Sequence, residues 1–230
     1  MIIPKTIKAI AWDLDGTLLN SFGIYSDILR RLAPTFGLPV PTSEMLLMNF
    51  HGQLHESING TFGGLNDDTL KKFENQFLIE QNAYYVHIDQ HLLEDAIILA
   101  DKATAASLKQ VIVTNRAHTG RDRASPRNIV EQSVLRQHIH HIICGDESGD
   151  YHKPDPRVFG DLFERWQIKP AELLVIGDQY VDAQLALNSG SRAIIVSREV
   201  DQPAHLDTLP TGWQNHVAVV KSLHSITFDA

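Results

Sequence analysis

Short apolar runs recur along the chain, and each is bounded by glycine, proline or polar residues. Most are rich in isoleucine and valine and are continuous rather than alternating, at 6–13, 109–115, 140–145, 172–178 and 191–197. Continuous apolar runs of this length are typical of strands that are buried on both faces, as in a parallel sheet. The run at 216–220 predicts a further strand at the sheet edge.

Helical patterns separate these strands, at 92–108, 125–137, 155–166 and 181–190. Ser125-Pro126 and the segment 153–156 place proline near a first helical turn, and Gly190 suits a helix end. Strands that alternate with helices indicate βαβ units with right-handed crossovers. The pattern therefore predicts an α/β fold with a doubly wound, Rossmann-like parallel sheet.

One long segment, 20–91, departs from this alternation. It contains amphipathic helical patterns and no strand-like run rich in valine or isoleucine, with the patterns at 21–38, 43–50 and 67–85. We expect a small helical domain at 20–91, inserted into a core formed by 1–19 and 92–230. An insertion directly after a strand end is suited to act as a lid, because open α/β sheets bind ligands at the carboxyl ends of their strands.

Composition and charge narrow the class of protein. The 230 residues are 43% hydrophobic and 21% charged, as in an ordinary globular protein. A net charge of −8 argues against nucleic acid or an anionic membrane as a partner. Cys144 is the only cysteine, so an intramolecular disulfide is excluded, and no run is long enough to span a membrane. We expect a cytoplasmic protein, monomeric or homodimeric, that acts on a small molecule.

Chemically active side chains gather where the predicted strands end. Because the carboxyl ends of parallel strands meet at one edge of a sheet, residues distant in sequence should lie together there. These residues are Asp13 and Asp15 after the first strand, Thr114, Asn115 and Arg116 after the second, Lys153 after the third, and Asp178 and Asp182 after the fourth.

This set of residues favours phosphate chemistry. Clustered carboxylates without histidine or cysteine suit a hard cation such as Mg²⁺, which would offset the repulsion between Asp13 and Asp15. Asp13 could then attack phosphorus to form an aspartyl-phosphate, while Asp15 exchanges protons with the leaving oxygen and with water. Thr114 and Lys153 could hold the phosphoryl group.

Four ordered motifs resemble those of the haloacid dehalogenase superfamily of hydrolases. They are DLDGTLL at 13–19, IVTN at 112–115, KPDP at 153–156 and GDQYVD at 177–182. The chain is most similar to the phosphatase branch that includes phosphoglycolate phosphatase and β-phosphoglucomutase, whose members carry a helical cap in the position of the insertion. The resemblance implies a Mg²⁺-dependent phosphatase acting on phosphoglycolate, a sugar phosphate or a nucleotide-like metabolite.

By this resemblance, Asp13 is the nucleophile and a Mg²⁺ ligand. Asp15 is the acid/base and binds the metal through its backbone carbonyl, while Asp178 completes the metal site. Thr114, Asn115 and Lys153 bind phosphate, and Asp182 supports Lys153 or a metal-bound water.

Several alternatives stay open from the sequence alone. His51, Gly52, Gln53 and His55 are candidates to choose the substrate, or else begin a helix with exposed polar residues. Arg116 stands where many relatives carry lysine or a small residue; it could contact an acidic group of the substrate or belong to a solvated loop. A sugar-phosphate mutase would use the same core residues, and a non-catalytic regulatory protein that binds metal or phosphate is the third possibility.

Overall fold

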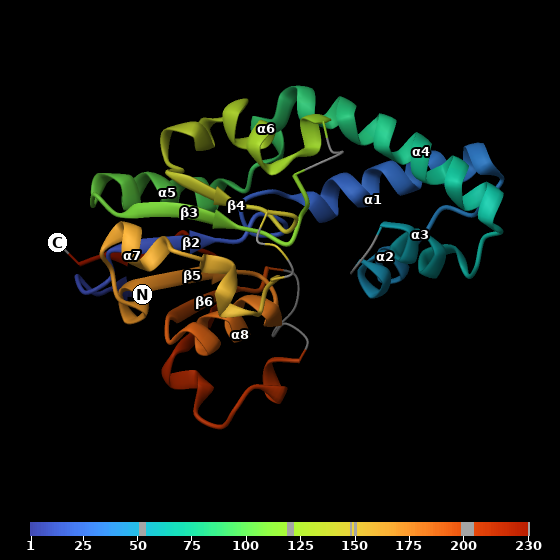
Figure 1. Ribbon diagram of the computed structural model, residues 1–230. Coiled ribbons are helices and arrows are strands. Elements are labelled where there is room, and N and C mark those ends of the chain that lie inside the picture. Colours follow the sequence, from blue (N-terminus) through green and yellow to red (C-terminus); the bar gives the residue numbers. More distant parts are fainter. Residues whose placement is uncertain (51–53, 119–121, 148, 150, 199–204, 230) are drawn as a thin grey trace. The chain divides into compact units, whose positions relative to one another are not determined.

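The computed structural model describes residues 1–50, 54–118, 122–147, 149, 151–198 and 205–229, which form two compact units (Figure 1). The first unit contains Met1–Leu19 and Leu92–Ala230, and the second contains Asn20–His91. The chain therefore leaves the first unit after Leu19 and returns to it at Leu92.

A six-stranded parallel sheet forms the centre of the first unit. Its strand order is β4-β3-β2-β5-β6-β7, and every neighbouring pair is parallel. The order changes direction at β2, which confirms the predicted doubly wound sheet. Each strand lies in a run predicted from the sequence: β2 Ala9–Trp12, β3 Lys109–Val113, β4 His141–Ile143, β5 Leu173–Gly177, β6 Arg192–Val196 and β7 Val217–Val220.

Helices cover both faces of this sheet (Figure 1). Residues with odd numbers along the strands, such as Ala11, Val111 and Val175, share a buried cluster with Leu162 and Ala183 of two helices. On the opposite face, the Gln110 amide donates to the Ala100 carbonyl of another helix at 3.1 Å. Continuous apolar strands are thus buried on both sides. The helices of this unit are α5 Glu94–Ala105, α6 Pro126–Glu131, α7 Leu162–Trp166 and α8 Tyr180–Ser189.

Two of the predicted helices are broken. The 125–137 segment divides into α6 and a 3₁₀ helix at Val134–Gln137, whose start is capped by the Ser133 hydroxyl. The 155–166 segment divides into a 3₁₀ helix at Pro156–Phe159 and α7, with Gly160 between them at a φ of +51°. Local hydrogen bonds and a left-handed backbone therefore override the helical period. Further 3₁₀ helices lie at Asp122–Ala124, Pro170–Glu172, Leu206–Thr208 and Trp213–Asn215.

The sequence patterns did not predict a second, two-stranded sheet. It pairs β1, Ile2–Ile3, with β8, Thr227–Phe228, in parallel. The Met1 amine also donates to the Ser225 carbonyl at 3.1 Å. The first and last segments of the described chain therefore lie together, as their places in Figure 1 indicate.

The regular secondary structure among the described residues of the second unit is helical. Asn20, Thr42 and Asn66 each accept a hydrogen bond from a backbone N–H of the following turn, and so begin α1, α2 and α4. Phe73 and Phe77 of α4 are buried in its core. Its elements are α1 Ser21–Leu32, a 3₁₀ helix at Ala33–Phe36, α2 Ser43–Asn49, α3 Leu54–Phe62, α4 Asp67–Tyr84 and a 3₁₀ segment at Tyr85–His91.

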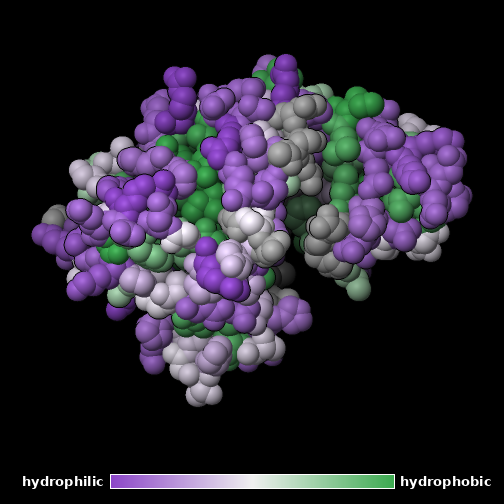
Figure 2. Space-filling view, viewed as in Figure 1, coloured by the Kyte–Doolittle hydropathy of each residue, from purple (hydrophilic) through white to green (hydrophobic). Residues whose placement is uncertain are grey.

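Hydrophilic side chains cover most of the face that Figure 2 shows, with smaller apolar patches between them. Within the described residues, every helix is too short or too polar to cross a membrane.

Candidate active site

The carboxyl end of β2 carries the residue around which the site is built. The Asp13 N–H donates to the Ile176 carbonyl at 2.8 Å, which continues the β2–β5 pairing past the end of β2. The chain then turns at Gly16, whose φ is +79°. A Cβ at this position would lie 2.3 Å from Asp178 Oδ2, so glycine lets the turn approach that carboxylate. Strand pairing and this turn together bring Asp13 and Asp178 to one edge.

A buried lysine ties three of the predicted motifs together. Lys153 Nζ donates to Asp13 Oδ1 at 2.5 Å and to Asp182 Oδ1 at 2.8 Å. Only 4% of the Lys153 side chain is exposed. Thr17 adds a further link, because its hydroxyl lies 3.3 Å from Asp13 Oδ2 and 3.5 Å from Asp178 Oδ1. Residues up to 169 positions apart therefore form one cluster, as expected for converging strand ends.

Burial and mutual repulsion make this cluster electrostatically unusual. Burial raises the pKa of Asp13 to about 7, although the Lys153 ammonium opposes that change. Burial, followed by the charges of Asp13 and Asp182, raises the pKa of Asp178 well above its ordinary value. For Lys153, burial alone would lower the pKa, but the carboxylates of Asp13 and Asp182 raise it. The lysine therefore stays a cation. Its single positive charge does not balance the negative charges of Asp13, Asp178 and Asp182.

The same carboxylates fit a divalent cation. Oxygens of Asp13, Asp178 and Asp182 lie within 4.8 Å of one another. An all-oxygen donor set is what Mg²⁺ prefers, and a cation there would relieve the repulsion that raises the carboxyl pKa values. Asp182 belongs to this group and also to the Lys153 ion pair; its expected role was to support the lysine or a metal-bound water.

Asn115 and Thr114 lie where the sequence predicts them, after β3. The Asn115 side-chain amide donates to the Lys153 carbonyl at 3.2 Å and accepts from the Lys153 N–H at 2.8 Å. This pair of hydrogen bonds holds the backbone that carries the buried ammonium. Thr114 is 4% exposed. Its hydroxyl accepts the Arg116 N–H at 3.1 Å, and a hydroxyl that accepts can also donate its own proton.

Asp15 has a partner that sequence reasoning did not find. Arg116 Nε donates to Asp15 Oδ2 at 2.9 Å, and Arg116 Nη2 contacts Asp15 Oδ1. The Arg116 side chain is 9% exposed, so it does not belong to a solvated loop. The Asp15 carboxylate is 29% exposed, more than those of Asp13 and Asp182.

Four of the residues that the sequence suggests for substrate selection lie in the helical unit, and the structure describes only one of the four. His51, Gly52 and Gln53 lie outside the described residues. His55 is an exposed residue of α3. Its place agrees with the alternative that this segment begins a helix with exposed polar residues.

The structure also identifies supporting residues that sequence reasoning missed. Thr17 lies inside the first motif, and its contacts with Asp13 and Asp178 were not foreseen. Arg198 follows the end of the predicted strand at 191–197; its Nη1 donates to the Gly16 carbonyl at 2.7 Å, and its Nη2 to Asp95 Oδ1 at 2.7 Å. A charged residue directly after a predicted strand was the available signal for Arg198.

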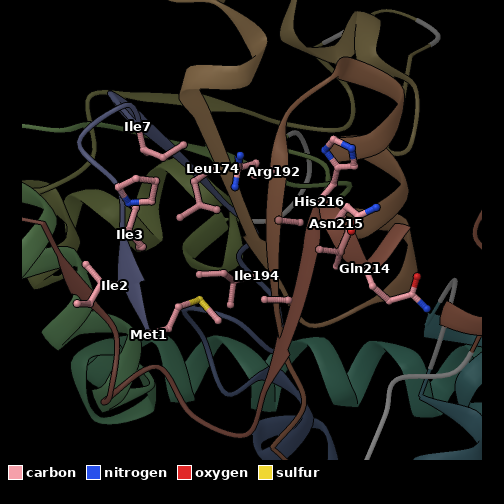
Figure 3. Close-up of a pocket in the computed structure, with 14 residues that line it drawn as sticks. Met1, Ile2, Ile3, Ile7, Leu174, Arg192, Ile194, Gln214, Asn215 and His216 are labelled. Carbon is pink, nitrogen blue, oxygen red and sulfur yellow. The ribbon is translucent and has the colours of Figure 1, made fainter. Parts of the chain in front are cut away.

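A separate cavity of about 260 Å³ lies in the same unit, and Figure 3 shows the residues that line it. Its lining includes Ile2 and Ile3 of β1 and the strand starts at Arg192 and Val217. In a parallel sheet, strand starts lie on the edge opposite the strand ends. The cavity is therefore distinct from the carboxylate cluster.

Comparisons with known proteins agree with this geometry. The family model described as haloacid dehalogenase-like hydrolase matches residues 7–190. A phosphoglycolate phosphatase from Nitrosospira multiformis is 25% identical over 200 residues, covering 85% of this chain and 86% of the relative. One from Thiobacillus denitrificans is 27% identical over 191 residues, covering 81% and 82%.

Solved structures show the same fold. A crystal structure of a predicted phosphoglycolate phosphatase from Haemophilus somnus has a TM-score of 0.73 at 20% identity and covers 96% of each chain. A hydrolase of the same superfamily from Geobacter sulfurreducens has a TM-score of 0.70 at 17% identity and covers 97% of each chain. At these identities the likeness concerns the fold alone.

Proposed function

The chain belongs to the haloacid dehalogenase-like hydrolases, and we propose that it is a Mg²⁺-dependent phosphatase that hydrolyses a small phosphate monoester through an aspartyl-phosphate on Asp13. The observation that carries this proposal is the buried Lys153 ammonium, which contacts Asp13 at 2.5 Å and Asp182 at 2.8 Å. A lysine held in this way next to a carboxylate at a strand end is suited to receive a phosphoryl group beside its nucleophile.

The residues divide the reaction between them. Asp13 attacks phosphorus while the bond to the leaving oxygen breaks, and Asp15 gives that oxygen a proton. Water then attacks the aspartyl-phosphate, Asp15 takes a proton from the water, and phosphate leaves as the Asp13 carboxylate is restored. General acid–base help of this kind typically contributes about 10²–10⁴-fold to the rate.

Charge balance explains the remaining residues. Asp13 and Asp178 would hold Mg²⁺ together with the Asp15 carbonyl, and bound Mg²⁺ would neutralise charge on the phosphate and the carboxylates. The Thr114 hydroxyl, which accepts the Arg116 N–H, would donate its own proton to a phosphoryl oxygen. Asn115 contributes by holding the Lys153 backbone at 2.8 and 3.2 Å.

The substrate we propose first is phosphoglycolate. Relatives that bear the name phosphoglycolate phosphatase match 81–85% of this chain at 25–27% identity. We assign the choice among small phosphate esters to the helical unit at 20–91, acting as a lid that excludes water during the reaction. A cytoplasmic location and a monomeric or homodimeric state stay predictions of the sequence.

The test is phosphate release from a panel that includes phosphoglycolate, sugar phosphates and nucleoside monophosphates, with Mg²⁺ and with a chelator. Asp13→Asn should abolish turnover. Asp161→Asn should not, since the Asp161 side chain is 71% exposed and pairs with the exposed Arg165 of α7 at 3.6 Å. Wild-type protein quenched during turnover of a ³²P-labelled ester should carry a hydroxylamine-sensitive label that Asp13→Asn lacks.

Four results would contradict the proposal. Isomerisation of a sugar phosphate without phosphate release would identify a mutase. Turnover that survives removal of Mg²⁺, or that survives in Asp13→Asn, would remove the metal or the nucleophile from the mechanism. Binding of Mg²⁺ without turnover of any ester in the panel would favour a regulatory protein.

A further inference from the structure

Arg116 contacts the carboxylate of Asp15 through two of its guanidinium nitrogens. Arg116 Nε donates to Asp15 Oδ2 at 2.9 Å, and Arg116 Nη2 contacts Asp15 Oδ1. Two parallel N–H···O contacts define an orientation as well as a position, because the guanidinium is planar and rigid. The plane of the Asp15 carboxylate is therefore set by Arg116.

Arg116 is itself held in place by the protein. Its Nη1 donates to the Ala124 carbonyl at 2.9 Å, so all three guanidinium nitrogens face protein acceptors. Its backbone N–H donates to the Thr114 hydroxyl at 3.1 Å, and its carbonyl accepts the Gly145 N–H at 3.0 Å. With 9% of its side chain exposed, Arg116 is a preorganised part of the site and not a mobile surface residue.

Within the described part of the chain, the orientation of the Asp15 carboxylate depends on a single residue, whereas the carboxylates of Asp13 and Asp182 each have two partners. Asp13 is held by Lys153 and Thr17, and Asp182 by Lys153 and a backbone N–H. Among the described residues, Arg116 is the only side chain that donates to the Asp15 carboxylate. An aspartate that is 29% exposed would otherwise rotate toward water.

We propose that Arg116 is a positioning residue for the proton transfers of Asp15, and that it does not bind the substrate. The inference rests on the proposed function, in which Asp15 gives a proton to the leaving oxygen and later takes one from water. When one Asp15 oxygen carries the proton, the other still accepts from Arg116, so the carboxyl group stays oriented throughout. Displacement of a catalytic group by about 1 Å can cost on the order of 10²-fold in rate.

Arg116→Gln separates positioning from substrate binding. With phosphoglycolate, we expect kcat to fall by roughly 10–100-fold while KM changes by less than about twofold, because the loss affects proton transfer. Arg116→Lys, which offers Asp15 a single ammonium, should restore part of kcat; it is also the variant to use if Arg116→Gln does not fold. Circular dichroism and thermal melting check that each variant is folded.

A second substrate identifies the step. Nitrophenolate is a good leaving group that does not need a proton from Asp15. With p-nitrophenyl phosphate, the first turnover of Arg116→Gln should therefore be as fast as in the wild type, whereas steady-state turnover should fall because water must still be activated. Arg127→Gln is the matched control: Arg127 also contacts a carboxylate through two nitrogens, but that carboxylate is Glu147, which has no part in the proposed mechanism.

The outcomes are distinguishable. A rise in KM of tenfold or more with unchanged kcat would overturn the inference, since it would make Arg116 a substrate-binding residue. Unchanged kinetics, or a first turnover with p-nitrophenyl phosphate as slow as steady-state turnover, would overturn it as well. Failure of the wild type to release phosphate would instead contradict the proposed function.

Discussion

Replacing Asp13 with asparagine should make the metal-free protein more stable at pH 8. Burial raises the pKa of Asp13 to about 7, and the nearby charges of Asp182 and Asp15 add to the effect of burial. The charged form of this side chain is therefore unfavourable in the folded protein. Asparagine has nearly the same shape, cannot ionise, and keeps an oxygen that can accept from Lys153 Nζ.

The sign and size follow from linkage between protonation and folding. As the pH rises above 3.8, Asp13 of the unfolded chain loses its proton, whereas Asp13 of the folded chain keeps it until about pH 7. The folded state binds more protons over this interval, so the free energy of unfolding falls as the pH rises. At 1.36 kcal/mol per pKa unit, the fall amounts to roughly 4 kcal/mol. Asp13→Asn should thus gain roughly 2–4 kcal/mol at pH 8, the lower figure applying if water reaches the ionised carboxylate.

Urea unfolding at pH 4, 6 and 8 with a chelator measures this gain. Tryptophan fluorescence, to which the buried Trp12 contributes, is a suitable probe. The gain should be largest at pH 8 and near zero at pH 4. Added Mg²⁺ should stabilise the wild type more than the variant. Asp161→Asn, whose carboxylate is exposed, should change stability by less than about 0.5 kcal/mol at each pH. A variant no more stable than the wild type at pH 8, or a gain as large at pH 4, would refute the reasoning.

Other predictions concern neighbouring features. Asp95 accepts hydrogen bonds from Arg198 and the backbone of Leu223, which lower its pKa although burial alone would raise it; Asp95→Asn should therefore cost roughly 1–3 kcal/mol at pH 7, and urea melts should show the difference from the wild type shrinking as the pH falls below 3.8. Gly16→Ala would place a Cβ 2.3 Å from Asp178 Oδ2, so calorimetry should show Mg²⁺ affinity reduced by more than about tenfold, since a displaced ligand no longer coordinates. Burial raises the pKa of Cys144 to about 12, so iodoacetamide should leave the folded protein unlabelled at pH 8 and label it in denaturant; rapid labelling of the native state would contradict this.

Much of the fold follows from local sequence pattern. The strand runs predicted β2 to β7 because a strand buried on both faces must be apolar at successive positions, whichever strands lie beside it. Helix starts were equally local: Ser125 caps α6 by accepting the Asn128 N–H at 3.3 Å, as the Ser-Pro pair indicated. The breaks inside two predicted helices were missed because the hydrophobic period continues across Gly160 and Ser133.

The members of the site could also be predicted from their places at strand ends, but of their pairings only that of Asp182 with Lys153 was among the expectations. From its own sequence position, Lys153 is a charged residue near a helix start. The fold shows it buried in contact with both Asp13 and Asp182. Arg116 reads as part of a basic loop until it meets Asp15, which is 101 positions earlier.

The sequence alone therefore determined the class of fold, the order of its elements and the residue types that meet at one edge of the sheet. Those features depend on hydrophobic periodicity, on helix capping and on the order of the elements, all of which can be recognised in the sequence. Only the tertiary structure decided that Lys153 also contacts Asp13 and that Arg116 contacts Asp15. It likewise decided how deeply the cluster is buried, and that Ile2–Ile3 pairs with Thr227–Phe228. Contacts of this kind depend on strand register and on the path of long connections. A shift of one residue in register turns every side chain of a strand to the other face of the sheet.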